Sequence, residues 1–316
     1  YTIANLMAGN SVLLKHASNV TGSGLLIEKI LHESELPSDL FRTIIIDHDQ
    51  SEALIGNDKV RGVTLTGSDS AGALVGQQAA KAIKKAVLEL GSNDAFIVLE
   101  DADIETAVET CTQARLINNG ETCVAAKRFI VVDSVYDEFR KRIVEKFEGT
   151  KAGDPMDDSS DIGPLARADL REQLHEQVEQ SVAKGATIAV GGKVPEGKGS
   201  FYPATILENV EKGQPAYDDE LFGPVASLIR AKDEDDAMRV ANDSRYGLGG
   251  AIFSKDEEKA VRLAREQFDT GMVYINGYGL ANPALPFGGV KNSGYGREHG
   301  GFGIKEFVNI KAVHVF

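Results

Sequence analysis

Short apolar runs alternate with amphipathic stretches along most of the 316 residues, and this alternation limits the possible folds more than any other feature. The runs have the length of strands, and the stretches between them have the composition and period of helices. Such alternation is typical of α/β proteins with largely parallel sheets. Strands are expected at residues 11–15, 63–66, 86–91, 96–99, 128–132, 187–192, 225–231, 249–254 and 271–276. Helices are expected at residues 70–86, 136–147 and 167–184, and from Ile104, Asp233 and Asp256 onward.

The composition is that of an ordinary globular protein, with 42% hydrophobic and 26% charged residues, and it allows two domains. No apolar run has membrane length, and the first residues lack a secretory signal pattern. The net charge of -14 argues against non-specific nucleic-acid binding. No Cys/His cluster has zinc spacing, so no metal site is expected. Two cysteines cannot form a disulfide framework, which indicates a reducing cytoplasm.

The two cysteines have different sequence surroundings. Cys111 shares one apolar helix face with Ile104, Ala107, Val108 and Ala114, and this predicts a small core residue. Cys123 lies in a polar turn, NNGETCVAAKR, outside any apolar stripe. Backbone N–H groups and nearby cations would favour a thiolate there. From the residues alone, a reactive thiol and an incidental cysteine remain about equally supported.

Two carboxylates stand in unusual positions. Glu89 interrupts the apolar strand AVLELG, where a buried carboxylate is costly unless it is paired or has a task. It is either a general base or one half of a structural salt bridge. Glu220 precedes a Gly-Pro turn in DDELFGPVA and could equally be a solvated charge.

Two segments have features of a phosphate or nucleotide site. Gly67 and Ser68 follow a strand and open a helix, whose N-terminal N–H groups suit a phosphate. A turn with an N-cap serine would look the same and is the better interpretation without other evidence. Lys15 ends a strand, a usual place for ligand contacts in α/β sheets, although an ordinary strand-end lysine is the simpler alternative.

Six segments together resemble the aldehyde dehydrogenase superfamily, in the family's order and over essentially the whole chain. They are LLKHAS, LTGS, VLELGSND, NGETCVAAKR, ELFGPV and, the most specific, PFGGVKNSGYGRE at 286–298. The resemblance implies that Cys123 is the nucleophile and Glu89 the general base. It also implies a cofactor, NAD or NADP, held by Lys15, Ser18, Gly67, Ser68, Leu90, Gly91, Glu220 and Phe222.

Within the superfamily, the pattern is similar to that of bacterial NAD(P)-dependent succinate-semialdehyde dehydrogenases. The implied reaction is oxidation of a small aldehyde through a thiohemiacetal and a thioester on Cys123. The Cys123 backbone N–H would bind the oxyanion, and Glu89 would activate the hydrolytic water. Ser18 replaces an acid common in NAD-preferring members, which makes NADP more acceptable.

The sequence also departs from the family pattern near the implied site. Ser92 replaces the second glycine of the base motif, and Glu121 replaces a glutamine. Ile117 stands where many succinate-semialdehyde enzymes have an arginine for the substrate carboxylate. Arg115 is two positions away and would be a poor substitute.

The resemblance implies an aldehyde-dehydrogenase-like α/β fold. Its expected parts are a Rossmann-type cofactor domain at 1–91, a catalytic domain at 92–292, a return to the cofactor domain at 293–306 and an oligomerisation strand at 307–316. The N-terminal part of the cofactor domain, with the family's oxyanion asparagine, is expected to lie upstream of this sequence. A homodimer or homotetramer is implied, with no nucleic-acid or membrane partner.

Two other functions remain open at this stage. A cofactor-independent thiol esterase could use the same thiol and base. A non-catalytic nucleotide-binding or assembly protein would instead have an unreactive Cys123.

Overall fold

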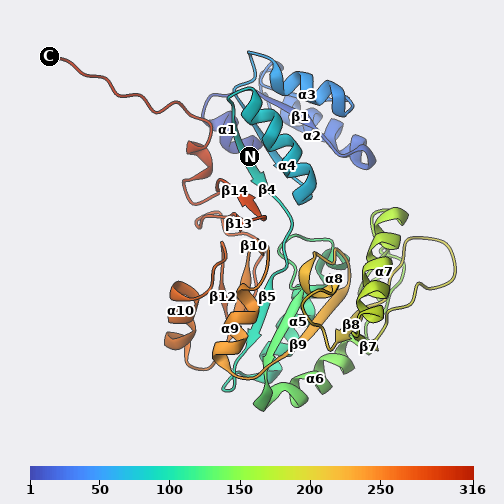
Figure 1. The fold of residues 1–316 in the computed structure, drawn as a ribbon. Coiled ribbons are helices and arrows are strands. Elements are labelled where there is room, and N and C mark those ends of the chain that lie inside the picture. The colour runs from blue at the N-terminus through green and yellow to red at the C-terminus, as the bar shows by residue number, and fades with distance from the viewer. The chain divides into compact units, whose positions relative to one another are not determined.

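The computed structural model describes residues 1–316, and the chain forms two units that interleave in sequence. Unit 1 comprises residues 1–90, 281–288 and 294–316, and unit 2 comprises residues 91–280 and 289–293. The chain therefore enters unit 2 directly after the strand that contains Glu89, and later returns to unit 1. Figure 1 colours the chain along its length and labels the elements of each unit.

Unit 1 has two small sheets with helices beside them. β1 and β2 pair in parallel, and β3, β4 and β14 form a second sheet in the order β14-β4-β3. The strands are β1 (Val12–Lys15), β2 (Phe41–Ile44), β3 (Gly62–Thr66), β4 (Lys85–Glu89) and β14 (Gly294–Tyr295). The helices are α1 (Thr2–Met7), α2 (Thr21–Glu33), α3 (His48–Gly56) and α4 (Asp69–Lys81), with short 3₁₀ turns at Ser18–Val20 and Gly303–Lys305.

A small apolar core joins α3 and α4 to β4. Ile55 and Ala79 on the helices pack with Ala86, Leu88 and Leu90 of the strand segment. Small residues on α4 allow this close packing, because a Cβ on Gly72 would come within 2.4 Å of the Leu90 side chain.

α4 is shorter than the sequence predicts. It ends at Lys81, and Ile83 takes a left-handed conformation with φ of 53°, so Lys84 and Lys85 do not lie in its last turn. The Lys84 ammonium instead donates to the carbonyl oxygens of Ile55 and Asn57, where it stabilises the C-terminus of α3. Lys85 begins β4. The prediction of a longer helix was wrong because this tertiary contact outweighs local helix propensity.

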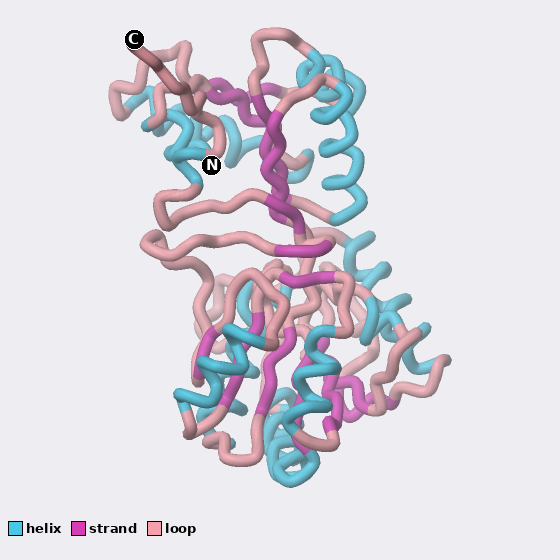
Figure 2. The backbone as a smooth tube through the Cα atoms, turned by 60° about the vertical axis from the view of Figure 1, so that its left-hand side comes forward, coloured by secondary structure: helices cyan, strands magenta, loops and turns pink.

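Unit 2 is built on one seven-stranded sheet in the order β12-β11-β5-β6-β9-β8-β7. Figures 1 and 2 show strands of this sheet with helices beside them. All neighbouring strands are parallel except β7, which is antiparallel to β8. The strands are β5 (Ala95–Val98), β6 (Arg128–Val132), β7 (Thr187–Val190), β8 (Thr205–Glu208), β9 (Val225–Ala231), β11 (Gly250–Phe253) and β12 (Tyr274–Ile275). A separate two-stranded sheet pairs β10 (Tyr246–Gly247) with β13 (Val290–Lys291).

Helices cover both faces of the seven-stranded sheet. They are α5 (Ile104–Leu116), α6 (Asp133–Glu148), α7 (Ala168–Ala183), α8 (Pro215–Asp218), α9 (Glu234–Asn242) and α10 (Glu257–Glu266). Alternate strand residues point to opposite faces, so Phe96 and Phe129 pack with α5 and α6 while Ile97 and Ile130 pack with α7, α9 and α10. Burial on both faces explains why the central strands are apolar throughout. The prediction of an α/β fold with largely parallel strands is thus confirmed.

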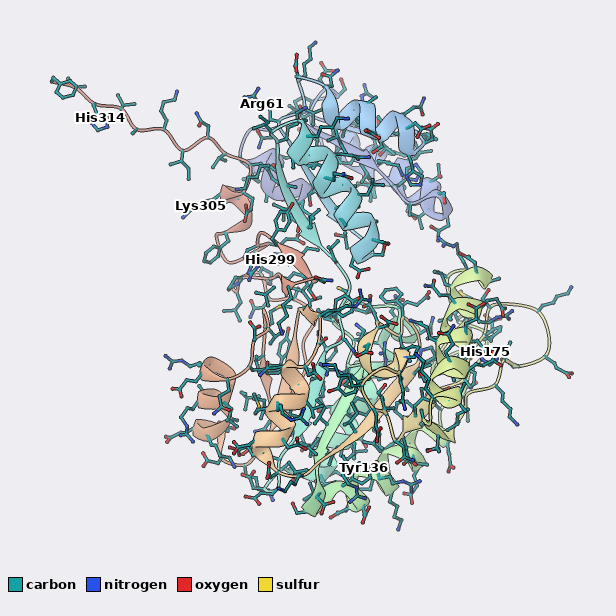
Figure 3. All side chains as sticks on the ribbon, in the orientation of Figure 1. Arg61, Tyr136, His175, His299, Lys305 and His314 are labelled. Carbon is teal, nitrogen blue, oxygen red and sulfur yellow. The ribbon has the colours of Figure 1, made fainter.

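The last residues of the chain extend away from unit 1 (Figure 1), and Figure 3 labels His314 on this tail. Residues 309–316 form no strand with any part of this chain. Ile310, Val313, Val315 and Phe316 are all exposed there. No helix of the structure is long and apolar enough to cross a membrane.

Candidate active site

The turn before Cys123 has an unusual backbone conformation. Asn118, Asn119 and Gly120 follow one another with φ of 49°, 58° and 78°, all in the left-handed region. Asparagine and glycine tolerate this region best. A side chain on Gly120 is also excluded, because its Cβ would lie 2.2 Å from the carbonyl oxygen of Gly223. The sequence Asn-Asn-Gly is therefore what allows the chain to turn sharply out of α5.

Polar contacts fix this turn to the segment at 163–166. The Asn119 side chain donates to the Pro164 carbonyl at 3.1 Å and accepts from the Gly163 N–H at 2.7 Å. One carboxylate oxygen of Glu121 accepts from the Ala166 N–H at 2.9 Å. Burial raises the pKa of Glu121. The departure at Glu121 thus has a structural role as an anchor of the turn before Cys123.

Arg115 holds the turn from inside unit 2. It is fully buried and donates to the carbonyl oxygens of Gly120 at 2.7 Å and Val225 at 3.3 Å. Burial lowers the pKa of its guanidinium to about 10. Because its side chain is committed to backbone carbonyls, Arg115 is a structural residue, as its position on the buried face of α5 requires.

The two cysteines differ as the sequence predicts. Cys111 is fully buried in the core between the sheet and α5, where burial raises the pKa of its thiol. Cys123 is half-buried in the loop that leads into β6, and neither cysteine forms a disulfide. Only Cys123 is therefore accessible to a substrate within unit 2.

A buried cation lies directly beside the Cys123 backbone. The Lys127 ammonium contacts the carbonyl oxygens of Thr122 and Cys123, the Ser92 hydroxyl at 2.8 Å and the Glu220 carboxylate at 3.1 Å. Glu220 also accepts from the Ser92 N–H at 3.0 Å. The structure thus brings Glu220, Ser92 and Cys123 together around one lysine.

Gly91 and Phe222 lie close to Glu220 within unit 2. A Cβ on Gly91 would come 2.4 Å from a Glu220 carboxylate oxygen, so glycine makes room for that carboxylate. Phe222 follows Glu220 by two residues and is exposed, while its neighbour Leu221 is buried. A carboxylate acceptor beside an exposed aromatic ring suits the hydroxyls and the flat base of a nucleotide.

In unit 1, Glu89 ends β4 in a buried position with 3% of its surface exposed. Burial and the nearby Glu298 carboxylate raise the pKa of Glu89 to about 8, and the Arg297 guanidinium opposes this shift. A carboxyl group with a pKa near neutral pH suits general-base chemistry. Its position argues against the alternative of a simple structural salt bridge.

The segment at 286–298 explains how a carboxylate fits at the end of β4. Gly294 pairs with Glu89 in the antiparallel contact of β14 with β4, and a Cβ on it would lie 1.9 Å from the Leu88 carbonyl oxygen. A Cβ on Gly288 would come 2.8 Å from a Glu89 carboxylate oxygen. The glycines of this segment therefore allow its backbone to approach β4 closely.

The remaining predicted cofactor residues lie in unit 1. The Gly67 N–H donates to the Glu89 carbonyl at 3.0 Å, which brings the turn before α4 next to the end of β4. Ser68 caps α4 by accepting from the Ala71 N–H at 3.2 Å, and both turn residues are exposed. The N-cap interpretation is correct, and the Ser70 N–H in the same turn is bound by the Asp69 carboxylate at 2.9 Å.

Lys15 and Ser18 lie at the C-terminal end of β1, and both are exposed. Leu90 belongs to the core under α4, so it contributes packing next to the turn. Within unit 1, an exposed ammonium group and exposed hydroxyls thus offer hydrogen-bond donors that suit a nucleotide. Each unit by itself thus carries groups that suit part of NAD or NADP.

Lys127 and Asp94 have structural roles that their sequence positions did not predict. The signal in the sequence is a pair of charged residues, Lys127 and Arg128, within the run AAKRFIVV, whose other residues are apolar. Asp94 accepts from the Gly249 N–H at 2.9 Å and is fully buried, and burial raises the pKa of its carboxyl while Lys127 opposes this. No group of three or more His, Cys, Asp or Glu side chains is arranged to hold a metal ion.

Comparison with known proteins gives consistent matches over nearly the whole chain. The family model described as "Aldehyde dehydrogenase family" matches residues 2–313. An NADP(+) succinate-semialdehyde dehydrogenase of Deinococcus radiodurans is 45% identical over 100% of this chain and 66% of its own length. An NAD(P)+ succinate semialdehyde dehydrogenase of Escherichia coli K12 is 44% identical over 98% of this chain and 66% of its own length. The chain thus spans slightly less than two thirds of these relatives.

Solved structures agree with these matches. A succinic semialdehyde dehydrogenase from Streptococcus pyogenes, in complex with NADP+, superposes with a TM-score of 0.97 at 38% identity, covering 99% of this chain and 69% of that one. A lactaldehyde dehydrogenase from Escherichia coli has a TM-score of 0.95 at 32% identity, covering 99% of this chain and 66% of that one.

Proposed function

This chain belongs to the aldehyde dehydrogenase family, and from that premise we propose that it oxidises a small aldehyde to its carboxylate with NAD+ or NADP+. Succinate semialdehyde is the first candidate substrate, because the two relatives described above carry that activity in their names. The observation that carries the proposal is Cys123, a half-buried thiol whose flanking backbone carbonyls are held by one buried ammonium.

In the proposed reaction, the Cys123 thiolate adds to the aldehyde carbon and forms a thiohemiacetal. The Cys123 N–H donates to the oxyanion that develops on the former carbonyl oxygen. A bound nicotinamide cofactor would supply the hydride acceptor for the oxidation, and the oxidised product held on Cys123 is a thioester. Glu89 then takes a proton from water, whose oxygen attacks the thioester and releases the carboxylic acid and the thiol.

For the cofactor, we propose that Glu220 accepts hydrogen bonds from the nicotinamide ribose and that Phe222 flanks the nicotinamide. The Gly67–Ser68 turn at the start of α4 would lie beside the pyrophosphate, with Leu90 and Gly91 completing that side, and Lys15 and Ser18 would bind the adenosine ribose. The exposed positions of Ser68, Lys15 and Ser18 support this assignment, because their side chains can donate to phosphate and ribose oxygens. A cytoplasmic location and assembly into a homodimer or homotetramer are part of the same proposal.

The test is spectrophotometric. The full-length protein is mixed with NAD+ or NADP+ and a panel of aldehydes that includes succinate semialdehyde and butanal, which has the same carbon chain without the carboxylate. We expect reduced cofactor to appear with succinate semialdehyde, and the ratio of kcat/KM for succinate semialdehyde over butanal measures how much the substrate carboxylate contributes. Cys123→Ala should abolish turnover, and Cys111→Ala, in the core, is the matched thiol control.

Absence of reduced cofactor with every aldehyde would overturn the proposed function. Ester cleavage without nucleotide, at a rate that nucleotide does not change, would favour a thiol esterase. Nucleotide binding without either activity, and with an unreactive Cys123, would favour a binding protein.

A further inference from the structure

Lys127 at the start of β6 is an unusual residue for its position. Only 2% of its side chain is exposed, whereas lysine is almost never fully buried unless it is paired. Its ammonium has three protons and is surrounded by four acceptor groups. They are the Ser92 hydroxyl, the Thr122 carbonyl, the Cys123 carbonyl and the Glu220 carboxylate. The ion pair with Glu220 offsets the desolvation of the charge, so the ammonium is held beside the Cys123 backbone.

The two carbonyl contacts lie on either side of the nucleophile. The Thr122 carbonyl, 3.2 Å from the ammonium, belongs to the same peptide group as the Cys123 N–H. The Cys123 carbonyl belongs to the next peptide group. A cation on both oxygens therefore fixes the two peptide planes that flank the Cys123 α-carbon.

The contact with Thr122 also has an electronic effect. A peptide group whose carbonyl binds a cation has a more strongly donating N–H, because hydrogen bonds in series polarise one another. The effect is larger in a buried site than in water. The polarised N–H in this case is that of Cys123, which the proposed reaction uses as oxyanion donor.

Ser92 forms a second, indirect connection between the Lys127 ammonium and the Cys123 carbonyl. Its hydroxyl accepts from Lys127 at 2.8 Å and donates to the Cys123 carbonyl. Its N–H donates to Glu220 at 3.0 Å. A glycine at this position would keep the contact to Glu220 and lose the hydroxyl contact.

We propose that Lys127 is a positioning residue for the oxyanion step, which orients and polarises the peptide group carrying the Cys123 N–H, with the Ser92 hydroxyl as its relay to the Cys123 carbonyl. This inference rests on the proposed function. Lys127 touches neither aldehyde nor cofactor in this role, since it acts through the Thr122–Cys123 peptide.

The test compares two reactions of Cys123 in the full-length protein. Aldehyde oxidation forms an oxyanion next to the Cys123 N–H, whereas alkylation of the thiolate by iodoacetamide does not. Both rates are measured over a range of pH up to the value at which they no longer increase. The variants are compared at this plateau, where differences in the ionisation of the Cys123 thiol no longer contribute. The variants are Lys127→Met, Lys127→Gln and Ser92→Gly, and Lys146→Met serves as control, because Lys146 forms an exposed ion pair with Glu109.

Direct loss of an oxyanion donor costs about 10²- to 10³-fold in kcat, so loss of its positioning should cost roughly 10- to 100-fold in Lys127→Met. Lys127→Gln, which keeps a donor without the charge, should lose less, and Ser92→Gly should lose severalfold. The alkylation plateau should stay within about threefold of the wild-type value in all variants. The aldehyde KM should change far less than kcat.

Equal losses in oxidation and alkylation would overturn the proposal, because they would mean that Lys127 only maintains the fold. An unchanged kcat in Lys127→Met would also overturn it. If Lys127→Met does not fold, Ser92→Gly alone tests the proposal, because it removes only the hydroxyl that lies between Lys127 and the Cys123 carbonyl. A wild-type protein whose Cys123 is alkylated but which oxidises no aldehyde would refute the proposed function itself, and this result differs from all outcomes above.

Discussion

At the scale of single residues, chemical role follows from burial and immediate neighbours. Cys111 and Cys123 are the same residue type, yet one is a core side chain and the other a half-buried thiol beside a cation. Glu89 and Glu220 also differ in their surroundings. Glu220 forms an ion pair with Lys127, whereas burial raises the pKa of Glu89. These differences set which groups can act as acid, base or nucleophile near neutral pH.

The pKa of Glu89, raised to about 8, predicts a pH dependence. A base must be ionised, so thioester hydrolysis should rise as pH increases through about 8 and level off above it. Glu298→Gln removes the nearby negative charge, so it should lower the midpoint, because the ionised form of Glu89 is then less disfavoured. The measurement is decay of the acyl-enzyme in rapid-quench experiments from pH 6 to pH 10.

Glu196→Gln, in the exposed loop at 193–200, is the matched control and should leave this midpoint unchanged. A midpoint in Glu298→Gln equal to or above that of the wild-type protein would contradict the assignment of Glu89 as the base.

Ser18 predicts the cofactor preference. It is exposed at the end of β1, where a carboxylate would repel a ribose phosphate and accept from ribose hydroxyls. Ser18→Glu should therefore shift the ratio of kcat/KM for NAD+ over NADP+ toward NAD+, by roughly tenfold, or about 1.4 kcal/mol. Steady-state kinetics with both cofactors measure this ratio, and a ratio that does not move would refute the role of Ser18.

At the scale of elements, the turn between α5 and β6 is the part of the chain that the proposed chemistry depends on most. Its left-handed residues, its anchors at 163–166 and the Arg115 contact together leave the backbone little freedom. Rigid backbone is what a nucleophile with a backbone oxyanion donor requires. Asn119, the first residue of the NGETCVAAKR segment, contributes to this element through two side-chain hydrogen bonds.

Gly120→Ala tests this turn. Its Cβ would lie 2.2 Å from the Gly223 carbonyl oxygen at a φ of 78°, so we expect a loss of roughly 3 kcal/mol in unfolding free energy and a large loss of kcat. Gly213→Ala is the control, because Gly213 has a φ of 96° and nothing within 4 Å of its Cβ position. It should cost about 1 kcal/mol from backbone strain alone.

Chemical denaturation measures both variants. Equal destabilisation of the two would show that the close contact with Gly223 does not constrain the turn.

At the scale of the whole molecule, the chain is divided between two units that each need distant segments. Unit 1 takes β14 from residues 294–295, and unit 2 takes β13 from residues 290–291. The glycine-rich segment at 286–298 therefore serves both units in turn. A Cβ on Gly294 would lie 1.9 Å from the Leu88 carbonyl oxygen in unit 1, and a Cβ on Gly289 would lie 2.5 Å from the Ser293 side chain in unit 2, so neither position has room for a side chain.

The C-terminal tail leads to a prediction about assembly. Residues 309–316 form no strand within this chain, and their alternating apolar side chains are exposed. An unpaired, apolar edge segment invites pairing with another chain. Deleting residues 309–316 should reduce the molecular mass measured by light scattering from that of a dimer or tetramer to a smaller species. An unchanged mass would argue against the tail as the pairing element.

The sequence by itself determined the alternation of strands and helices, the core position of Cys111, the separate position of Cys123 and the family. These properties depend on local period and on short motifs, which are visible in one dimension. Only the tertiary structure decided that α4 stops at Lys81, that Arg115 is committed to carbonyls and that Lys127 holds the backbone of Cys123. The physical reason is that buried polar groups take their partners from distant segments, as Ser92 and Glu220 do at a separation of 128 residues.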